Sequence, residues 1–162
     1  MTAAALLAAA ALGGCGADGD GEARDPAPLT GRVVRVTDGD TIRVRLASGR
    51  EERVRYIGVD TPETAKPGTP AECYADRAAA YNATLVGDRE VRLVRDVEER
   101  DRYGRLLAYV YVGGTNVGAE LVRRGYAVPL TVPPNVRHAD RFRRLAAEAR
   151  RAGSGLWAAC AS

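Results

Sequence analysis

The stretch VVRVTDGDTIRVRL at residues 33–46 alternates apolar and polar side chains on both sides of the dipeptide Asp38-Gly39. An alternation with a period of two residues is typical of strands that have one buried face. The dipeptide Asp-Gly favours the tight turns that join neighbouring antiparallel strands. The stretch therefore predicts a strand over residues 33–36, a tight turn, and a second strand over residues 42–46.

The sequence after this hairpin continues with further strands and with helices between them. A third strand is expected over residues 54–59, directly before Asp60, and a loop rich in proline follows at 63–71. The remaining periodic segments predict helices at 72–86, 116–124 and 137–151 and strands at 90–95 and 106–112. Five short strands with interleaved helices predict an α+β domain. A five-stranded OB-fold β-barrel with three α-helices is the closure that such short strands favour.

The N-terminal residues resemble a targeting segment. Residues 2–13, TAAALLAAAALG, form an apolar run that is shorter than the about 20 residues needed to cross a bilayer. This run is typical of the apolar region of a signal peptide, although no basic residue precedes it. LGGC at residues 12–15 resembles a bacterial lipobox, in which the cysteine is acylated. We therefore expect a lipoprotein signal peptide at 1–14 and lipidation of Cys15; a secreted protein with an unmodified Cys15 is the alternative.

A change of composition separates this segment from the rest of the chain. Residues 15–28, CGADGDGEARDPAP, are rich in glycine and aspartate and show no apolar periodicity. They predict a flexible acidic tether, which places the folded domain at residues 29–162. With a net charge of −3 in the tether and +3 for the whole chain, the domain carries +6. A modestly basic domain suits a polyanionic partner.

Export decides how the cysteines are interpreted. The protein is expected at the cell envelope, anchored to the membrane through lipidated Cys15, or secreted. Both locations are oxidising, which favours a disulfide between Cys73 and Cys160, the two other cysteines. Such a bridge ties the C-terminal tail to the middle of the domain; two free thiols are the alternative. No Cys-x-x-Cys pair is present, so a cysteine zinc site is not expected.

Few kinds of catalysis suit the side chains of this sequence. His138 is the single histidine, and it lies in a helical stretch beside basic residues. A Cys-His nucleophile pair is not expected if the cysteines are lipidated or bridged. Of the 24 basic side chains only Lys66 is a lysine, and arginine binds phosphate in a bidentate way. Carboxylates and arginines remain as the chemistry that the chain offers.

Two aspartates lie where predicted strands meet loops. Asp40 is at the start of the second strand, and Asp60 is at the end of the third. If their carboxylates converge, they form an oxygen site for a hard cation such as calcium or magnesium, to which Thr61 can add its backbone carbonyl. Each aspartate also has a structural interpretation, the first as part of a hairpin turn and the second as an Asx turn before a proline.

Three further side chains suit phosphodiester chemistry. Glu63, three residues after Asp60, can accept a proton from an attacking water. Arg55 and Arg105 can stabilise the extra negative charge on the phosphate oxygens in the transition state. Arg55 and Asp60 differ in strand parity, so they should lie on opposite faces unless a bulge intervenes. A solvated salt bridge is the alternative interpretation of each arginine.

Together these segments resemble the staphylococcal nuclease (thermonuclease) family in order and spacing. The matching motifs are DGDT at 38–41, RYIGVDTPET at 55–64, RYGR at 102–105, LVRRGYA at 121–127 and GLW at 155–157. The similarity covers about residues 29–158. One of these motifs alone would be weak, whereas the ordered set is highly specific.

The resemblance implies an OB-fold barrel with three helices and calcium-dependent cleavage of DNA and RNA to products that end in a 3′-phosphate. It implies one calcium ion per domain. The expected ligands are the carboxylates of Asp40 and Asp60 and the main-chain carbonyl of Thr61, with Asp38 acting through water.

The resemblance also implies roles for the remaining side chains. Glu63 is expected to act as the general base or to orient the attacking water, and Arg55 and Arg105 are expected to bind the scissile phosphate. Tyr103 lies next to this second arginine and is expected to contact the nucleotide. Arg102 keeps the positive charge of the lysine that is common at its position in the family, and it is expected to bind substrate as well.

One segment departs from the family, whose members often carry tyrosines after the LVRxG helix that hold the nucleotide base. Residues 128–132, VPLTV, contain none. The alternative to an endonuclease is a non-catalytic OB-fold lipoprotein that binds nucleic acid. Carboxylates at a phosphate site repel a polyanion unless a cation intervenes, so Asp40 and Asp60 favour the enzyme. We expect an endonuclease that is a monomer.

Overall fold

The computed structural model describes residues 27–160. The predicted signal peptide, Cys15 and nearly all of the predicted tether lie outside this range. Within it, no helix has both the length and the apolar character that crossing a membrane requires.

Five strands close into a barrel. They are β1 (Leu29–Val36), β2 (Thr41–Leu46), β3 (Glu51–Tyr56), β5 (Glu90–Val94) and β6 (Leu106–Val112). In the order β3-β2-β1-β5-β6 each strand pairs antiparallel with the next, and a parallel pairing of β3 with β6 closes the ring. The predicted α+β domain with a five-stranded OB-fold barrel is confirmed.

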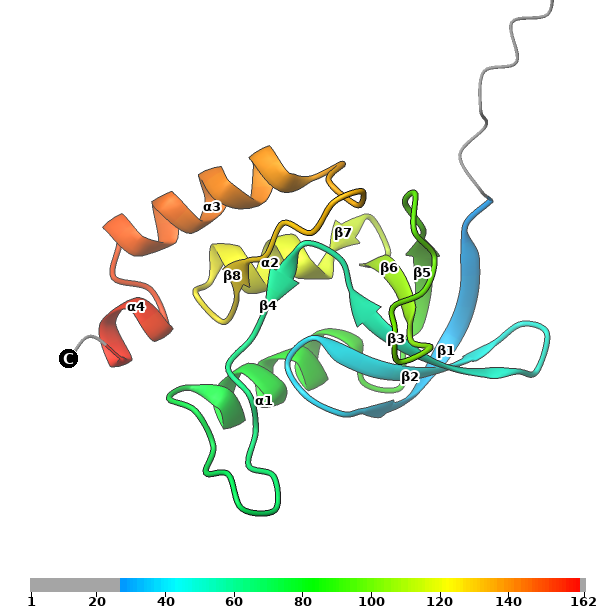
Figure 1. The fold of residues 1–162 in the computed structure, drawn as a ribbon, viewed down its shortest axis with the longest axis horizontal. Helices are drawn as coiled ribbons and strands as arrows, with labels where there is room; N and C mark the ends of the chain where they lie inside the picture. Colours follow the sequence, from blue (N-terminus) through cyan, green and yellow to red (C-terminus); the bar gives the residue numbers. More distant parts are fainter. Residues whose placement is uncertain (1–26, 161–162) are drawn as a thin grey trace, which may run out of the picture.

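Between residues 27 and 160 four helices accompany the barrel, one more than predicted. They are α1 (Ala75–Val86), α2 (Val117–Arg123), α3 (Ala139–Arg151) and α4 (Leu156–Ala159). The short strands are β4 (Val59–Asp60), which pairs with β8 (Val128–Pro129), and β7 (Thr115–Asn116), which pairs with β6. In Figure 1 the barrel strands gather on the right, and α3 lies on the opposite side of the molecule, beyond α2. The sequence analysis missed α4 because one helical turn is too short to show an apolar period.

Local backbone conformations set where the helices begin. The helix predicted at 72–86 begins only at Ala75, because Tyr74 adopts a left-handed conformation with a φ of 73°. At the start of α2, the side-chain oxygen of Asn116 accepts a hydrogen bond from the Ala119 N–H at 2.8 Å, as expected of a helix cap.

The third predicted strand, residues 54–59, is two strands in the structure. β3 ends at Tyr56 and β4 begins at Val59, because Gly58 between them has a φ of 82°. α3 packs closely against this glycine, since a Cβ at Gly58 would lie 2.5 Å from Cε2 of Phe142. The chain turns here, so residues before and after the break do not share one strand parity.

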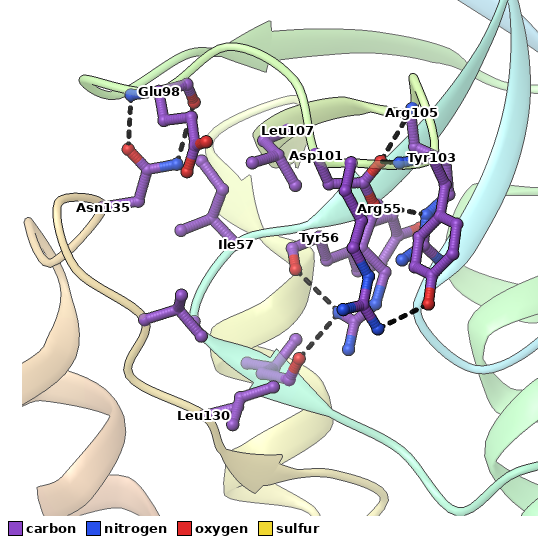
Figure 2. A pocket seen from close by; sticks show the side chains of 14 residues that line it. Arg55, Tyr56, Ile57, Glu98, Asp101, Tyr103, Arg105, Leu107, Leu130 and Asn135 are labelled. Carbon is purple, nitrogen blue, oxygen red and sulfur yellow. Dashed lines mark hydrogen bonds and ion pairs between the residues drawn. The ribbon is translucent and has the colours of Figure 1, made fainter.

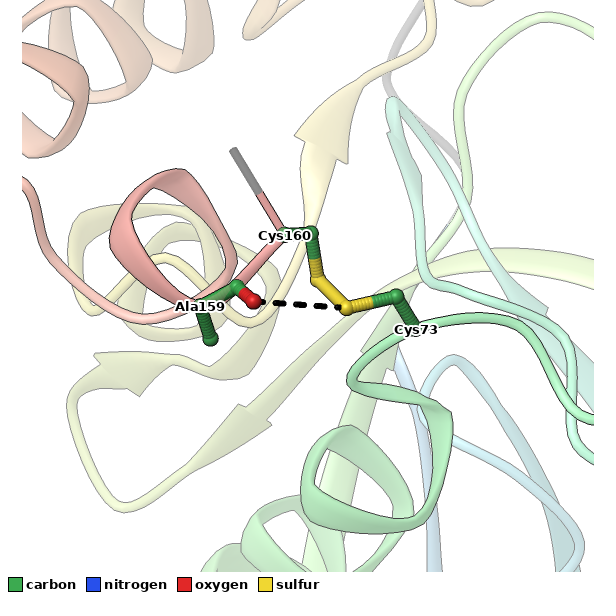
Figure 3. Close-up of a disulfide and its surroundings, with 3 residues drawn as sticks. All are labelled: Cys73, Ala159 and Cys160. Carbon is green, nitrogen blue, oxygen red and sulfur yellow. Dashed lines mark hydrogen bonds between the residues drawn. A yellow bond between two sulfur atoms is a disulfide. The ribbon is translucent and has the colours of Figure 1, made fainter. Parts of the chain in front are cut away.

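Cys73 and Cys160 form the predicted disulfide (Figure 3). Their Cα atoms lie 5.9 Å apart, although 87 positions separate the two residues in sequence. The bridge joins the segment before α1 to the residue that follows α4, so it ties the C-terminal end of the domain to the chain that leads away from β4.

Candidate active site

Asp40 is buried at the start of β2, and its carboxylate is directed at the chain after β4. Its Oδ2 accepts hydrogen bonds from the Thr61 N–H at 3.0 Å and from the Thr61 hydroxyl at 3.2 Å. Its Oδ1 accepts the Thr41 hydroxyl at 3.1 Å. The turn itself is supported by Asp38, whose Oδ1 accepts the Asp40 N–H at 3.1 Å. Asp38 therefore supports the hairpin turn, which leaves the Asp40 carboxylate available to contact other elements.

The guanidinium of Arg55 holds two aspartates together. Its Nη2 lies 2.8 Å from Oδ1 of Asp60 and 3.2 Å from Oδ2 of Asp40. Its Nη1 donates to the carbonyls of Tyr56 and Val59, each at 2.8 Å. Strand parity would place Arg55 and Asp60 on opposite faces of an uninterrupted strand, but the chain breaks between β3 and β4 and the two side chains meet.

Burial dominates the protonation of both carboxylates. It raises the pKa of Asp40 to about 7, against the opposing effect of Arg55 and with a further rise from the charge of Asp38. Burial also raises the pKa of Asp60, again against Arg55, and the negative charge of Glu63 adds to the rise. Two carboxylates thus share one guanidinium, which compensates their negative charge only in part.

A buried hydrogen-bond network from α1 supports the turn before β2. Asn82 is fully buried; it accepts a hydrogen bond from the Tyr56 hydroxyl at 2.9 Å and donates one to the Asp38 carbonyl at 3.0 Å. The sequence analysis missed Asn82. The available signal was a polar side chain on the face that it shares with the buried Ala75 and Ala78.

Arg105 is fixed by Asp101 in the charged connection before β6. Its Nε donates to Oδ2 of Asp101 at 2.7 Å, and its backbone N–H donates to Oδ1 at 2.9 Å. The same carboxylate accepts the Tyr103 N–H at 2.9 Å. Burial acts to raise the pKa of Asp101, but the hydrogen bonds from Arg105 and Tyr103 outweigh it and lower this pKa. The sequence analysis missed Asp101, because only the folded turn distinguishes it from the other acids at 96–105.

Tyr103 projects next to these groups with 61% of its surface exposed. The Nη2 of Arg102 donates to its hydroxyl at 2.6 Å. The guanidinium carbons of Arg102 and Arg105 lie 4.8 and 5.5 Å from the centre of its ring. The two cations contact the aromatic ring, which nevertheless remains accessible.

A cavity of about 320 Å³ brings Arg55 and Arg105 together. In Figure 2, both arginines and Tyr103 lie on one side of this cavity, and Leu130 lies across from them. Leu130 and Val132 give the cavity an aliphatic wall and are 42% and 54% exposed. This wall belongs to the segment in which the sequence lacks tyrosines.

Glu63 contacts its own loop. Lys66 donates to its Oε2 at 2.6 Å. Its backbone N–H donates to Oε2 of Glu72 at 2.9 Å, and its carbonyl accepts the Glu72 N–H at 2.9 Å. Between residues 27 and 160 the structure shows no hydrogen bond or ion pair from Glu63 to Arg55 or Arg105. Glu63 therefore lies near enough to Asp60 to affect its pKa, but it is hydrogen-bonded to Lys66 and Glu72 and not to the two arginines. Sequence reasoning missed Glu72.

The described part of the chain contains no group of three or more His, Cys, Asp and Glu side chains that could hold a metal ion. Asp40 and Asp60 nevertheless converge on the same nitrogen atom, and Thr61 is hydrogen-bonded to the first of them. The donors available to a hard cation are thus two carboxylates, backbone carbonyls and water.

A closed OB barrel with two arginines at one cavity, and with two carboxylates on the first of them, has the groups that an OB-fold enzyme of phosphodiester hydrolysis needs. The sequence model of the staphylococcal nuclease homologue family matches residues 53–159 of the chain. The chain belongs to this family, and it is a hydrolase of the micrococcal-nuclease type.

Three known relatives match most of the chain. The thermonuclease of Staphylococcus hyicus is 38% identical over 128 residues, which are 79% of this chain and 75% of the relative. The thermonuclease of Staphylococcus intermedius is 40% identical over 125 residues, which are 77% of this chain and 74% of the relative. The endonuclease YncB of Bacillus subtilis (strain 168) is 42% identical over 125 residues, which are 76% of this chain and 59% of that protein. The family predicted from the order of the motifs is confirmed.

Proposed function

We propose that the chain is a calcium-dependent endonuclease that hydrolyses DNA and RNA and leaves products with 3′-phosphate ends. The position of Arg55 carries this proposal. Its guanidinium contacts Asp40 and Asp60, and its side chain lines the same cavity as Arg105. A phosphate bound in this cavity would contact both arginines, the first of which also holds the carboxylate pair.

The donor set fits calcium as the cation. Ca²⁺ takes about six to eight oxygen ligands in flexible geometry, and carboxylates, backbone carbonyls and water are its usual donors. Asp40 and Asp60 would hold the ion through their carboxylates and Thr61 through its main-chain carbonyl, with Asp38 acting through water. When bound, the ion supplies positive charge that polarises the phosphate and stabilises its transition state.

The two arginines are held in place before a substrate arrives. Arg105 is fixed by Asp101, and Arg55 is fixed by two backbone carbonyls. Donors that are already in position stabilise the negative charge that develops on the phosphate oxygens without reorganising during the reaction. Loss of one such donor typically lowers kcat by about 10²–10³-fold.

Glu63 is the proposed general base. Its carboxylate takes a proton from the attacking water as the water oxygen bonds to phosphorus. The bond from phosphorus to the 5′ oxygen breaks, so the phosphate remains on the 3′ side. The 5′ oxygen leaves with the bonding electron pair and takes a proton from solvent water, which gives a 5′-hydroxyl end. The backbone N–H of Glu63 donates to the Glu72 carboxylate, and the Glu63 carbonyl accepts the Glu72 N–H. These two hydrogen bonds limit the positions that the Glu63 carboxylate reaches.

Tyr103 and Arg102 are proposed to contact the nucleotide next to the scissile phosphate. An exposed aromatic ring is a surface on which a base of any identity can stack. Leu130 and Val132 would contact the nucleotide from the other wall through dispersion alone. We therefore expect cleavage with little sequence preference.

We also propose that the protein is a monomer at the cell envelope, anchored through lipidated Cys15. This proposal rests on the sequence of residues 1–28. Mass spectrometry of the membrane fraction is expected to find an acylated Cys15, and an unmodified, soluble protein would overturn anchoring. Analytical ultracentrifugation of detergent-solubilised protein tests the monomer.

Cleavage of single-stranded DNA and of RNA by the purified protein tests the proposed activity, with calcium, with magnesium and with a chelator. We expect cleavage with calcium, no cleavage with the chelator, and products that a 3′-phosphatase converts to 3′-hydroxyl ends. A folded protein that binds DNA but does not cleave it, whether calcium or magnesium is added, would instead be a non-catalytic OB-fold nucleic-acid-binding lipoprotein.

A further inference from the structure

Three arginines lie side by side across the outer face of the barrel. In the β1–β2 pairing Arg35 is opposite Arg43, and in the β2–β3 pairing Arg43 is opposite Arg53. All three are exposed. We call these three residues the arginine row.

Within the described domain two members of the arginine row, Arg35 and Arg53, lack the acidic partner that neighbouring arginines have, and Arg43 has only a distant one. Two residues further along β2, on the same face, Arg45 is opposite Glu51 and forms an ion pair with it at 2.7 Å. Within the row, Arg43 is 3.8 Å from the same glutamate, and residues 27–160 provide no hydrogen bond or ion pair for the side chains of Arg35 and Arg53. Like charges directly opposite each other destabilise a sheet, so the fold does not account for this arrangement.

The arginine row leads to the candidate active site. β3 and β6 run parallel with Val54 paired to Leu106, so the preceding residues, Arg53 and Arg105, occupy neighbouring positions. Arg53 is also two residues before Arg55 on the same strand, which places both on one face. A line of arginines therefore runs across β1, β2 and β3 and ends at the arginines of the cavity.

The length of this line suits a polynucleotide. Neighbouring strands are about 4.8 Å apart, so four adjacent positions span about 15 Å. With a rise of about 3.4 Å per nucleotide in a stacked strand, this corresponds to about four nucleotides. Arginine forks match phosphate oxygens in geometry as well as in charge.

We propose that Arg35, Arg43 and Arg53 bind the sugar–phosphate backbone of the nucleic-acid strand that is cleaved at Arg55 and Arg105. The proposal rests on the proposed function, because it takes the same strand as ligand. A lipid surface is less suited, because none of the large exposed apolar side chains between residues 27 and 160 lies on these three strands. The arginine row contacts phosphates and not bases, so it raises the affinity for longer strands whatever their sequence.

The test compares two variants of the full chain that lose the same charge. One is Arg35→Gln/Arg43→Gln/Arg53→Gln. The control is Arg141→Gln/Arg144→Gln/Arg151→Gln, which removes three exposed arginines from α3, on the opposite side of the molecule (Figure 1). Each set lowers the net charge by three. Circular dichroism melting confirms that both variants fold.

Binding of a fluorescent 20-nucleotide single-stranded DNA is measured with a chelator present, over a range of salt concentrations. The row variant is expected to bind at least tenfold more weakly, with a salt slope lower by about 2, because each lost phosphate contact removes about 0.7. The ratio of kcat/KM for the 20-mer to kcat/KM for a trinucleotide should fall as well. The α3 variant should stay within about threefold of the unmodified protein.

Equal losses in the two variants would overturn the proposal, because net charge alone would then explain binding. So would a row variant that binds DNA normally but loses binding to vesicles of anionic lipid. If the unmodified protein does not cleave DNA with either calcium or magnesium, the endonuclease proposal fails. The binding comparison still tests the arginine row in that case.

Discussion

Glu63 and Asp101 are carboxylates with proposed roles in cleavage, and they have opposite environments. The side chain of Glu63 is 55% exposed and pairs with Lys66, whereas the side chain of Asp101 is 17% exposed and accepts hydrogen bonds from Arg105 and Tyr103. An exposed carboxylate with one flexible partner exchanges that partner readily. A half-enclosed carboxylate with several donors is a fixed support. The proposed roles, a proton acceptor and a holder of Arg105, correspond to these two environments.

Substitution of Glu63 tests its proposed role. Glu63→Gln keeps the shape of the side chain but removes its basicity, so kcat should fall by about 10²–10⁴-fold. The affinity for single-stranded DNA, measured with a chelator, should change less than threefold. Turnover close to that of the unmodified protein would remove Glu63 from the mechanism.

Substitution of Asp101 tests the support of Arg105. Asp101→Asn weakens the hydrogen bond to Nε of Arg105, and a displaced arginine should lower kcat/KM by about 10–100-fold. The matched control is Glu99→Gln, which removes the 2.6 Å ion pair to Arg95 on the same connection. We expect the control to keep its activity. Equal losses in both variants would show that the connection responds to any lost charge.

At the scale of elements, the break between β3 and β4 shapes the site. This break brings Asp60 back to Arg55. The left-handed conformation of Gly58 produces the break. Gly49, in the turn between β2 and β3, has a similar φ of 85°, but no atom lies within 4 Å of a Cβ built there. A side chain at Gly49 would therefore meet backbone strain alone, whereas a side chain at Gly58 would meet backbone strain and a clash with α3.

Alanine substitutions measure this difference. Gly58→Ala should lower the free energy of unfolding by about 2–4 kcal/mol, from left-handed strain together with the contact with Phe142. Gly49→Ala carries the strain alone and should cost about 1 kcal/mol. Urea denaturation measures both values. Similar costs for the two variants would mean that α3 moves aside without penalty.

The N-terminus of α3 introduces a dependence of stability on pH. His138 precedes this helix, and burial, followed by Arg141 and Arg137, lowers its pKa. The folded state thus disfavours the protonated ring, and the unfolded chain binds the proton more readily. The stabilising contribution is complete above about pH 6.5, the ordinary pKa of histidine, and it is lost as the pH falls toward the folded-state pKa.

A pH series on a variant isolates this contribution. Between pH 7.5 and 5 the unmodified protein should lose more free energy of unfolding than His138→Gln, whose side chain does not titrate. Parallel curves for the two proteins would show that His138 titrates alike in the folded and unfolded states.

The elements differ in how far the sequence could predict them. Alternation in residues 33–46 predicted the β1–β2 hairpin, because an amphipathic strand displays its period locally. The same rule failed at residues 54–59, where the conformation of Gly58 depends on packing against a helix more than 80 positions away. Period and turn residues report on the local chain only.

The site shows the same limit. Asp40, Asp60, Arg55 and Arg105 could be proposed from their residue types and motif order, because the chemistry is carried by the side chains themselves. Asn82, Asp101 and Glu72 support these groups through hydrogen bonds that exist only in the folded chain. Their residue types are common on protein surfaces, so the sequence alone did not single them out.

For the whole molecule, the disulfide between Cys73 and Cys160 is the main covalent constraint in the described domain. Cross-linking so long a segment restricts the unfolded chain, and a loop of this length is worth about 4 kcal/mol in the chain-entropy model. Cys73→Ser/Cys160→Ser should lower the free energy of unfolding by about this amount. Denaturation of the unmodified protein with and without a reductant should show the same difference. An unchanged stability would mean that the unfolded chain is already compact around this segment.

The same bridge gives the chain an uneven topology. Residues 73–160 form a closed covalent ring, and residues 27–72 are an open arm that leaves it. Arg105 belongs to the ring, whereas Arg55, Asp40 and Asp60 belong to the arm, so the site is assembled from two parts that meet through strand pairing. One cut inside the ring leaves a single covalent molecule, but one cut in the exposed loop at 63–71 removes the covalent link between the carboxylates and the second arginine and leaves strand pairing alone to join them. A protease that reaches this loop would therefore separate the site into two fragments, even while the disulfide is intact.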